Sequence, residues 1–63
     1  MKICEIKEPG FYIDDIDDVL EIKFIDGNLY GHWINYKNHY SWSISNIDNE
    51  VEKLTELHKL LYL

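Results

Sequence analysis

The feature that most constrains this fold is a repeated alternation of apolar and polar residues between positions 19 and 45. Alternation with a period of two is typical of half-buried strands, and here it predicts three antiparallel strands in a row, a meander. Asp26-Gly27-Asn28 supplies the first turn, because glycine adopts a positive φ at no steric cost. Two-residue loops bring one set of residues onto a common face: Leu20, Ile22, Phe24, Leu29, Gly31, Trp33, Tyr40, Trp42 and Ile44. We predict that this face is buried and that Gly31 leaves room there for a large neighbour.

Residues 47–62 are predicted to form the one helix of the chain. Their apolar residues and one histidine recur at spacings of three and four: Ile47, Val51, Leu54, His58 and Leu61. Ser45, Asn46 or Asp48 can cap its start. We expect this helix to pack across the tryptophan-bearing face, which leaves Leu60 and Leu63 outside the stripe as a candidate dimer seam.

The N-terminus is predicted to add a short hairpin. Residues 1–7 are β-prone, Pro9-Gly10 fits a type II turn, and residues 11–13 can return as a second strand. This pairing would place Cys4, Ile6, Phe11 and Ile13 on one face. The predicted architecture is therefore a single α+β domain over residues 1–63, with a small antiparallel sheet and one C-terminal helix. A chain of 63 residues buries a small core, which favours a homodimer or a partner that completes it.

The charge of the chain restricts its partners. Six lysines, no arginine and twelve acidic residues give a formal net charge of −6, which disfavours direct binding to nucleic acid. An acidic surface instead suits a basic protein, including a host protein that handles nucleic acid. The single cysteine indicates a reducing compartment, and no apolar run approaches the length of a bilayer span. We therefore expect a cytoplasmic protein without membrane contact.

The face opposite the tryptophans is the first candidate binding surface. It carries Tyr30, His32, Ile34 and Tyr36, and tyrosine and histidine side chains are enriched where proteins meet. One interpretation is a flat recognition face. The alternative is a solvated face that the N-terminal hairpin partly covers, in which the tyrosines pack across strands.

The second candidate surface is the acidic stretch Asp14, Asp15, Asp17 and Asp18, which is predicted to be a loop. It does not match a calcium-binding loop, because Ile16 occupies a ligand position and the required glycine is absent. The remaining interpretations are a solvated connector that Ile16 anchors to the core, or a docking patch for a basic partner.

No motif in the chain indicates chemistry. His32, His39 and His58 show no metal-ligand spacing, and Cys4 lies among isoleucines. We therefore expect no cofactor, no metal and no enzymatic activity. The composition, which lacks Ala, Gln and Arg and is rich in Ile, Asn, Lys and Tyr, suggests a low-GC bacterium or its phages. The favoured hypothesis is a phage or mobile-element protein that inhibits a host protein, of the anti-CRISPR or other anti-defence type. The alternatives are a homo-oligomeric structural or regulatory protein, and a ligand-binding unit in which His32 and His39 of two chains converge.

Overall fold

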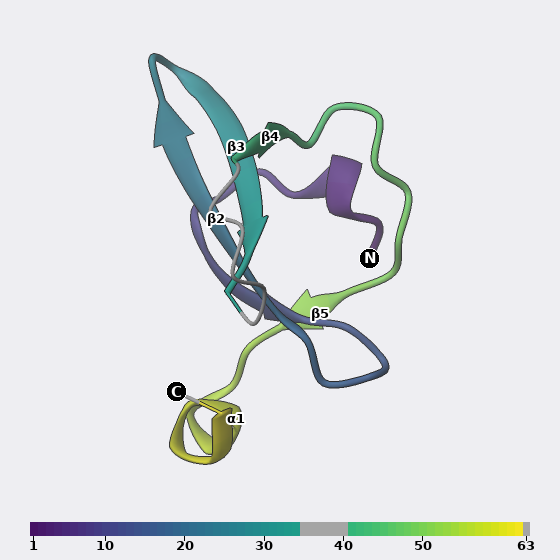
Figure 1. Ribbon diagram of the computed structural model, residues 1–63, viewed down its shortest axis with the longest axis vertical. Coiled ribbons are helices and arrows are strands. Elements are labelled where there is room, and N and C mark those ends of the chain that lie inside the picture. The colour runs from purple at the N-terminus through teal and green to yellow at the C-terminus, as the bar shows by residue number, and fades with distance from the viewer. Residues whose placement is uncertain (35–40, 63) are drawn as a thin grey trace.

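The structure, a computed structural model, describes residues 1–34 and 41–62. Figure 1 shows an antiparallel sheet with a short C-terminal helix at one end of the molecule, so the chain is a small α+β domain that is mostly β. The strands and the helix are β1 (Gly10–Ile13), β2 (Val19–Ile25), β3 (Asn28–Trp33), β4 (Trp42–Ser43), β5 (Glu52–Lys53) and α1 (Glu56–Tyr62). The five strands form one sheet in the order β4-β3-β2-β1-β5.

The predicted meander is confirmed over the described residues. Leu20 pairs with Trp33 and Ile22 with Gly31 between β2 and β3, and Gly31 pairs with Trp42 between β3 and β4. The first turn is a two-residue loop in which Asp26 and Gly27 have φ values of 52° and 83°, as a type I′ hairpin requires. The predicted face is therefore correct; Tyr40, which was assigned to it, lies outside the described residues.

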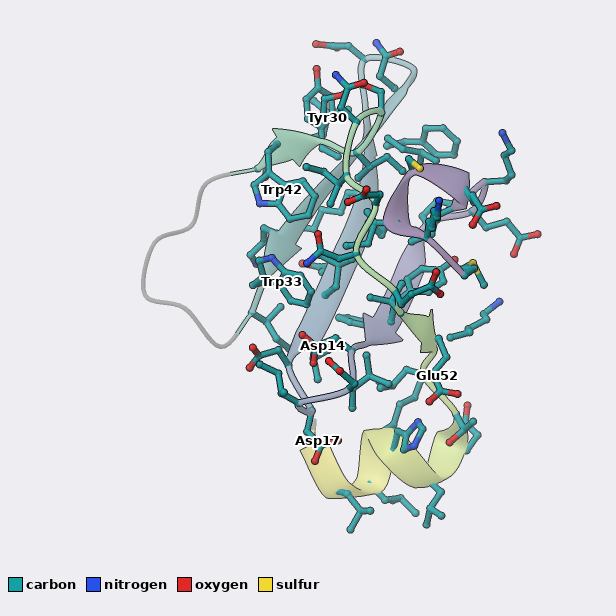
Figure 2. The ribbon with its side chains drawn as sticks, turned by 90° about the vertical axis from the view of Figure 1, so that its right-hand side faces the viewer. Asp14, Asp17, Tyr30, Trp33, Trp42 and Glu52 are labelled. Carbon is teal, nitrogen blue, oxygen red and sulfur yellow. The ribbon has the colours of Figure 1, made fainter. Side chains whose placement is uncertain are left out.

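Gly31 does leave room for a large neighbour, and that neighbour is Trp42. A Cβ on Gly31 would lie 3.0 Å from Cη2 of the Trp42 ring and 3.1 Å from Cδ1 of Ile22. The indole of Trp42 thus lies over the glycine backbone, with its ring centroid 6.4 Å from that of Trp33 (Figure 2). Both tryptophans are partly buried and pack against the main core.

The main core lies between the tryptophan-bearing face of the sheet and two segments that cross it. Its buried members are Ile3, Ile6, Tyr12, Leu20, Ile22, Ile44 and Val51. The covering side chains therefore come from residues 1–6 and 44–51, which run beside each other in Figure 1. Phe24 lies on the predicted face but is 57% exposed, because the covering segments do not extend to the tip of the β2–β3 hairpin.

The predicted helix over residues 47–62 is wrong in its start and in its packing. Helix α1 begins at Glu56, and it lies at the end of the sheet instead of across the tryptophan-bearing face. The backbone of the preceding segment bonds to the N-terminus: Ile3 N donates to Asn49 O at 2.9 Å, and Cys4 N to Ile47 O at 2.8 Å. In this extended segment, Ile47 and Val51 pack in the main core and Leu54 packs in a second cluster. A spacing of three and four between apolar residues therefore did not indicate a helix here.

The predicted N-terminal hairpin is also wrong. Residues Ile3–Glu5 form a single 3-10 turn, and β1 pairs on its two sides with β2 and β5. Register with β2 places Tyr12 opposite Leu20 on the main-core face, so Phe11 and Ile13 lie on the other face of the sheet. The physical reason is that the amides of the first residues bond to residues 47–49, which leaves β1 free to join the meander.

A second, smaller cluster forms on the face opposite the tryptophans. Ile13, Val19 and Leu54 are buried there, and Phe11 and Ile34 pack against them. Leu54 lies two residues before the start of α1, and its amide donates to Phe11 O at 3.0 Å. This cluster attaches the end of the chain to the sheet and covers part of the face that was predicted to be open.

Candidate functional site

The first candidate surface is only partly assembled as predicted. Tyr30 and His32 lie side by side with other polar residues on the face opposite the tryptophans, since His32 pairs with Glu21 and Tyr30 with Lys23 and Ser43. Tyr30 and His32 are half-buried. Tyr36, the fourth predicted member, lies outside the described residues.

The charged groups on this face already have partners. Glu21 Oε1 lies 3.4 Å from Lys23 Nζ and 3.5 Å from His32 Nδ1. The carboxylate is thus shared between a lysine and a histidine of the same surface. Charges that are matched within the protein attract a partner weakly, because the partner must displace an existing interaction.

Ile34 serves the second cluster as well as the surface. Its side chain packs against the cluster of Ile13, Val19 and Leu54, and its amide donates to Val19 O at 3.0 Å. A residue that holds the chain end against the sheet is less available to a partner. The predicted recognition face is therefore reduced to Tyr30, His32 and their polar neighbours.

The acidic loop is organised by one of its own side chains. Asp14 Oδ1 accepts hydrogen bonds from Ile16 N at 3.0 Å and Asp18 N at 2.8 Å, and Asp14 N donates to Asp18 O at 3.1 Å. Asp17 takes a left-handed φ of 63°, which aspartate tolerates better than most residues. Asp14 therefore has a structural role, while Asp15 and Asp17 are exposed.

The interpretation that Ile16 anchors this loop to the core is wrong. Its side chain is 71% exposed. The hydrogen bonds of Asp14 close the loop instead.

The structure brings a second acidic segment next to the loop. An open hollow of about 260 Å³ is lined by Met1, Ile13, Asp14, Asp15, Glu50, Val51 and Glu52. Antiparallel pairing of β1 with β5 places Glu52 opposite Ile13, immediately before Asp14 in the chain. Figure 2 shows Asp14 and Glu52 on these neighbouring segments. We call this feature the acid-rimmed hollow, because its lining combines four carboxylates with the buried residues Ile13 and Val51.

The electrostatics of the acid-rimmed hollow are negative. Among its lining residues the cationic group is the Met1 amine, which lies 3.2 Å from Glu50 Oε2 and donates to Val51 O at 2.8 Å. Asp15 and Glu52 are exposed. Within residues 1–34 and 41–62, no group of three or more His, Cys, Asp or Glu side chains is placed to hold a metal ion.

Sequence reasoning found Asp14 and Asp15 but missed Glu50 and Glu52. Both glutamates lie within residues 47–62, the segment predicted to be a helix. The alternation Glu50-Val51-Glu52 could have indicated a strand, since it places both carboxylates on one side and the valine on the other.

Comparison with models of protein families, with curated proteins and with solved structures finds no match for this chain. Within the described part of the chain, no helix is both long enough and apolar enough to span a bilayer.

Proposed function

We propose that the protein is a non-enzymatic binding protein that holds a basic protein partner at the acid-rimmed hollow. The observation that carries the proposal is the convergence of carboxylates from two distant segments, at Asp14 and Asp15 and at Glu50 and Glu52, around buried Ile13 and Val51.

The chemistry of the hollow fits a lysine or arginine side chain. These side chains combine an apolar stem with a cationic head, so the stem can lie against Met1, which is half exposed in the lining, while the head reaches the carboxylates. Exposed carboxylates are weak contacts one at a time, but several together create a potential that attracts a basic surface. The formal charge of −6 acts in the same direction over a longer range.

The hollow is a stronger candidate than the face bearing Tyr30 and His32. On that face the carboxylate of Glu21 is shared by Lys23 and His32, and Ile34 belongs to the second cluster. The lining of the hollow carries four carboxylates and one ammonium group, that of Met1, which lies 3.2 Å from Glu50 Oε2. The unbalanced charge is what distinguishes a surface prepared for a cationic partner.

The partner that this charge suits best is a protein with a groove for nucleic acid. Such grooves are lined with lysine and arginine, and an acidic protein that occupies one excludes the nucleic acid by competition. The proposed function is therefore inhibition of a nucleic-acid-handling host protein in the bacterial cytoplasm, of the kind that phage anti-CRISPR or other anti-defence proteins carry out. The acidic surface and the low-GC composition support this proposal.

The test uses variants that remove the same charge from two places. The hollow variant carries Asp15→Asn, Glu50→Gln and Glu52→Gln, and it retains Asp14 because that side chain closes the loop. The control variant carries three exposed changes outside the hollow: Glu8→Gln, Asp26→Asn and Glu56→Gln. Both variants have a formal charge three units less negative than the original −6.

The immobilised protein is used to capture a partner from lysate of a low-GC bacterium, and the affinity of the purified partner is then measured by calorimetry. We expect the hollow variant to lose about tenfold or more in affinity and the control to lose at most about threefold, since several charged contacts are removed together. Equal losses would show that net charge alone attracts the partner. Unchanged affinity in both variants would place the binding surface elsewhere.

A further inference from the structure

The turn between β2 and β3 holds the one aspartate of the chain that is followed by a glycine, Asp26-Gly27. The other two glycines follow a proline and a tyrosine, and no asparagine precedes a glycine. In any chain, the backbone nitrogen of the residue after an aspartate can attack the carbon of the aspartate carboxyl group. Glycine hinders this approach least, because it has no Cβ.

The structure leaves this turn uncovered. Asp26 and Gly27 are exposed, and a Cβ built on Gly27 would meet no heavy atom within 4 Å. Figure 1 shows that the tip of the β2–β3 hairpin extends beyond the segments that cover the main core. Within residues 1–34 and 41–62, the Asp26 carboxylate takes part in no hydrogen bond or ion pair that would hold it away from the backbone.

The other aspartates lack this combination. The carboxylate of Asp14 is held by the amides of Ile16 and Asp18 at 3.0 and 2.8 Å. Each of the others is followed by a residue with a Cβ, which hinders the approach of the backbone nitrogen. They are Asp15, Asp17, Asp18 and Asp48, followed by isoleucine, aspartate, valine and asparagine.

We propose that Asp26-Gly27 is a site of spontaneous isoaspartate formation. The Gly27 nitrogen loses its proton and bonds to Cγ of Asp26, and a carboxyl oxygen leaves as water, which closes a five-membered succinimide ring. Water then adds to one of the two ring carbonyl carbons. Breaking the bond from nitrogen to Cγ restores aspartate, whereas breaking the bond from nitrogen to the original main-chain carbon gives isoaspartate. One water molecule leaves and one is added, and nothing is oxidised or reduced.

The hairpin allows this step without unfolding of the sheet. The turn is closed by the pair of Ile25 with Asn28, and both residues are exposed at the tip. Exposed ends of a sheet open locally at a small cost in free energy, which gives the nitrogen access to Cγ. The register of β2 and β3 is fixed further along by the buried residues Leu20 and Ile22.

The product changes the tip and leaves the rest of the domain as it is. Isoaspartate adds one atom to the main chain of a two-residue loop, whose twist otherwise matches the two strands. In Figure 2 Tyr30 lies toward the tip, whereas Asp14 and Glu52 lie toward the other end of the molecule. The modification is therefore separate from the acid-rimmed hollow, and this inference does not depend on the proposed function.

The test is peptide mapping of the full chain after several weeks in warm, neutral buffer. Cleavage after lysine gives a peptide of residues 24–37, in which Asp26 is the one aspartate, and a peptide of residues 8–23, which contains the four aspartates of the acidic loop. Isoaspartate leaves the mass of a peptide unchanged but alters its chromatographic elution and its backbone fragments in mass spectrometry. We expect it to form at Asp26 about tenfold or more faster than at any loop aspartate, which corresponds to roughly 1.4 kcal/mol in activation free energy.

Two variants make the result specific. Gly27→Asn keeps a residue that tolerates the left-handed φ of 83° and has open space for its Cβ, so the fold should stay intact, which circular dichroism checks. Its added Cβ should slow isoaspartate formation at Asp26 about tenfold. Asp26→Glu cannot close a five-membered ring, so the second elution peak of unchanged mass should vanish.

Three results would overturn the proposal. The first is isoaspartate at Asp26 no faster than in the peptide of residues 8–23. The second is an equal rate in Gly27→Asn, since the missing Cβ would then have no effect. The third is persistence of the second peak in Asp26→Glu, which would assign the product to another residue.

Discussion

Replacing Gly31 with valine tests the packing on which the register of the sheet depends. A Cβ at this position would lie 3.0 Å from the Trp42 ring and 3.1 Å from Ile22 Cδ1, and valine adds two further methyl groups. Gly31 has no positive φ, so its backbone can accept a side chain. The substitution therefore acts through steric contact and not through backbone strain.

The expected magnitude follows from two opposing effects. Replacing a strand glycine with a β-branched residue stabilises by about 0.5–1 kcal/mol, while overpacking a filled core costs about 1–3 kcal/mol. With the ring of Trp42 and the methyl group of Ile22 both within 3.1 Å, the second effect is larger. We expect the free energy of unfolding to fall by about 1–2 kcal/mol, which lowers the Tm of a domain of this size by roughly 4–16 °C.

The assay is urea and thermal denaturation followed by far-ultraviolet circular dichroism, in two backgrounds. In a Trp42→Leu background the ring atoms are gone, so Gly31→Val should cost at least about 1 kcal/mol less there. Ser43→Val is the control. Ser43 follows Trp42 on the edge strand β4, and it is exposed on the face of the sheet opposite Trp42. A Gly31→Val protein as stable as the original, or an equal loss in both backgrounds, would refute the predicted contact.

Three further predictions concern the core, the helix and the pH dependence. Leu20→Ala, at a side chain that is 0% exposed, should lower the free energy of unfolding in urea by about 2–5 kcal/mol, while Phe24→Ala at the open hairpin tip should cost much less. Thr55→Ala should lose about 1 kcal/mol and reduce the helical circular dichroism, and Thr55→Ser should retain both. Burial, reinforced by the charge of Glu8, raises the pKa of Tyr12 above its ordinary value of 10.0. The folded protein then keeps this proton to higher pH than the unfolded chain, so stability should fall as pH rises through 10.0, and Tyr12→Phe should lack that part of the fall in urea denaturation.

The β2–β3–β4 part of the sheet could be predicted because its information is local. The alternation through Leu20 and Ile22 and the Asp26-Gly27 turn fix the pairing without reference to distant residues. Gly31 could be interpreted in advance for the same reason. The alternation places Gly31 on the buried face, whereas the identity of its neighbour, Trp42, comes from the pairing of β3 with β4.

The C-terminal third could not be predicted in this way, since it depends on contacts with the other end of the chain. Ile47, Val51 and Leu54 have helical spacing, but Val51 N donates to Met1 O at 2.8 Å and Leu54 N to Phe11 O at 3.0 Å. Long-range backbone pairing therefore overrode a local pattern. Helix α1 begins at Glu56 and is capped by Thr55, and His58, three residues after Thr55, takes the place of the usual glutamate of a capping box.

The candidate site also combines a local feature that the sequence shows with a long-range contact that it does not show. The acidity of Asp14 to Asp18 is visible in the sequence, whereas its proximity to Glu50 and Glu52 arises from the pairing of β1 with β5. A surface that combines two segments this far apart in the chain cannot be recognised from either one. The same holds for Leu57, Leu60 and Leu61, which are exposed because α1 lies at the end of the sheet and not across a face.

The central claim is that a basic partner sits at the acid-rimmed hollow, and backbone amide chemical shifts measured by NMR during titration with the captured partner test it most directly. We predict the largest shift changes at Asp15, Glu50 and Glu52, and that these changes are weaker when salt screens the charges. Largest changes at Tyr30, His32 and Ser43, with the hollow unaffected, would contradict the claim and assign binding to the surface that bears Tyr30 and His32.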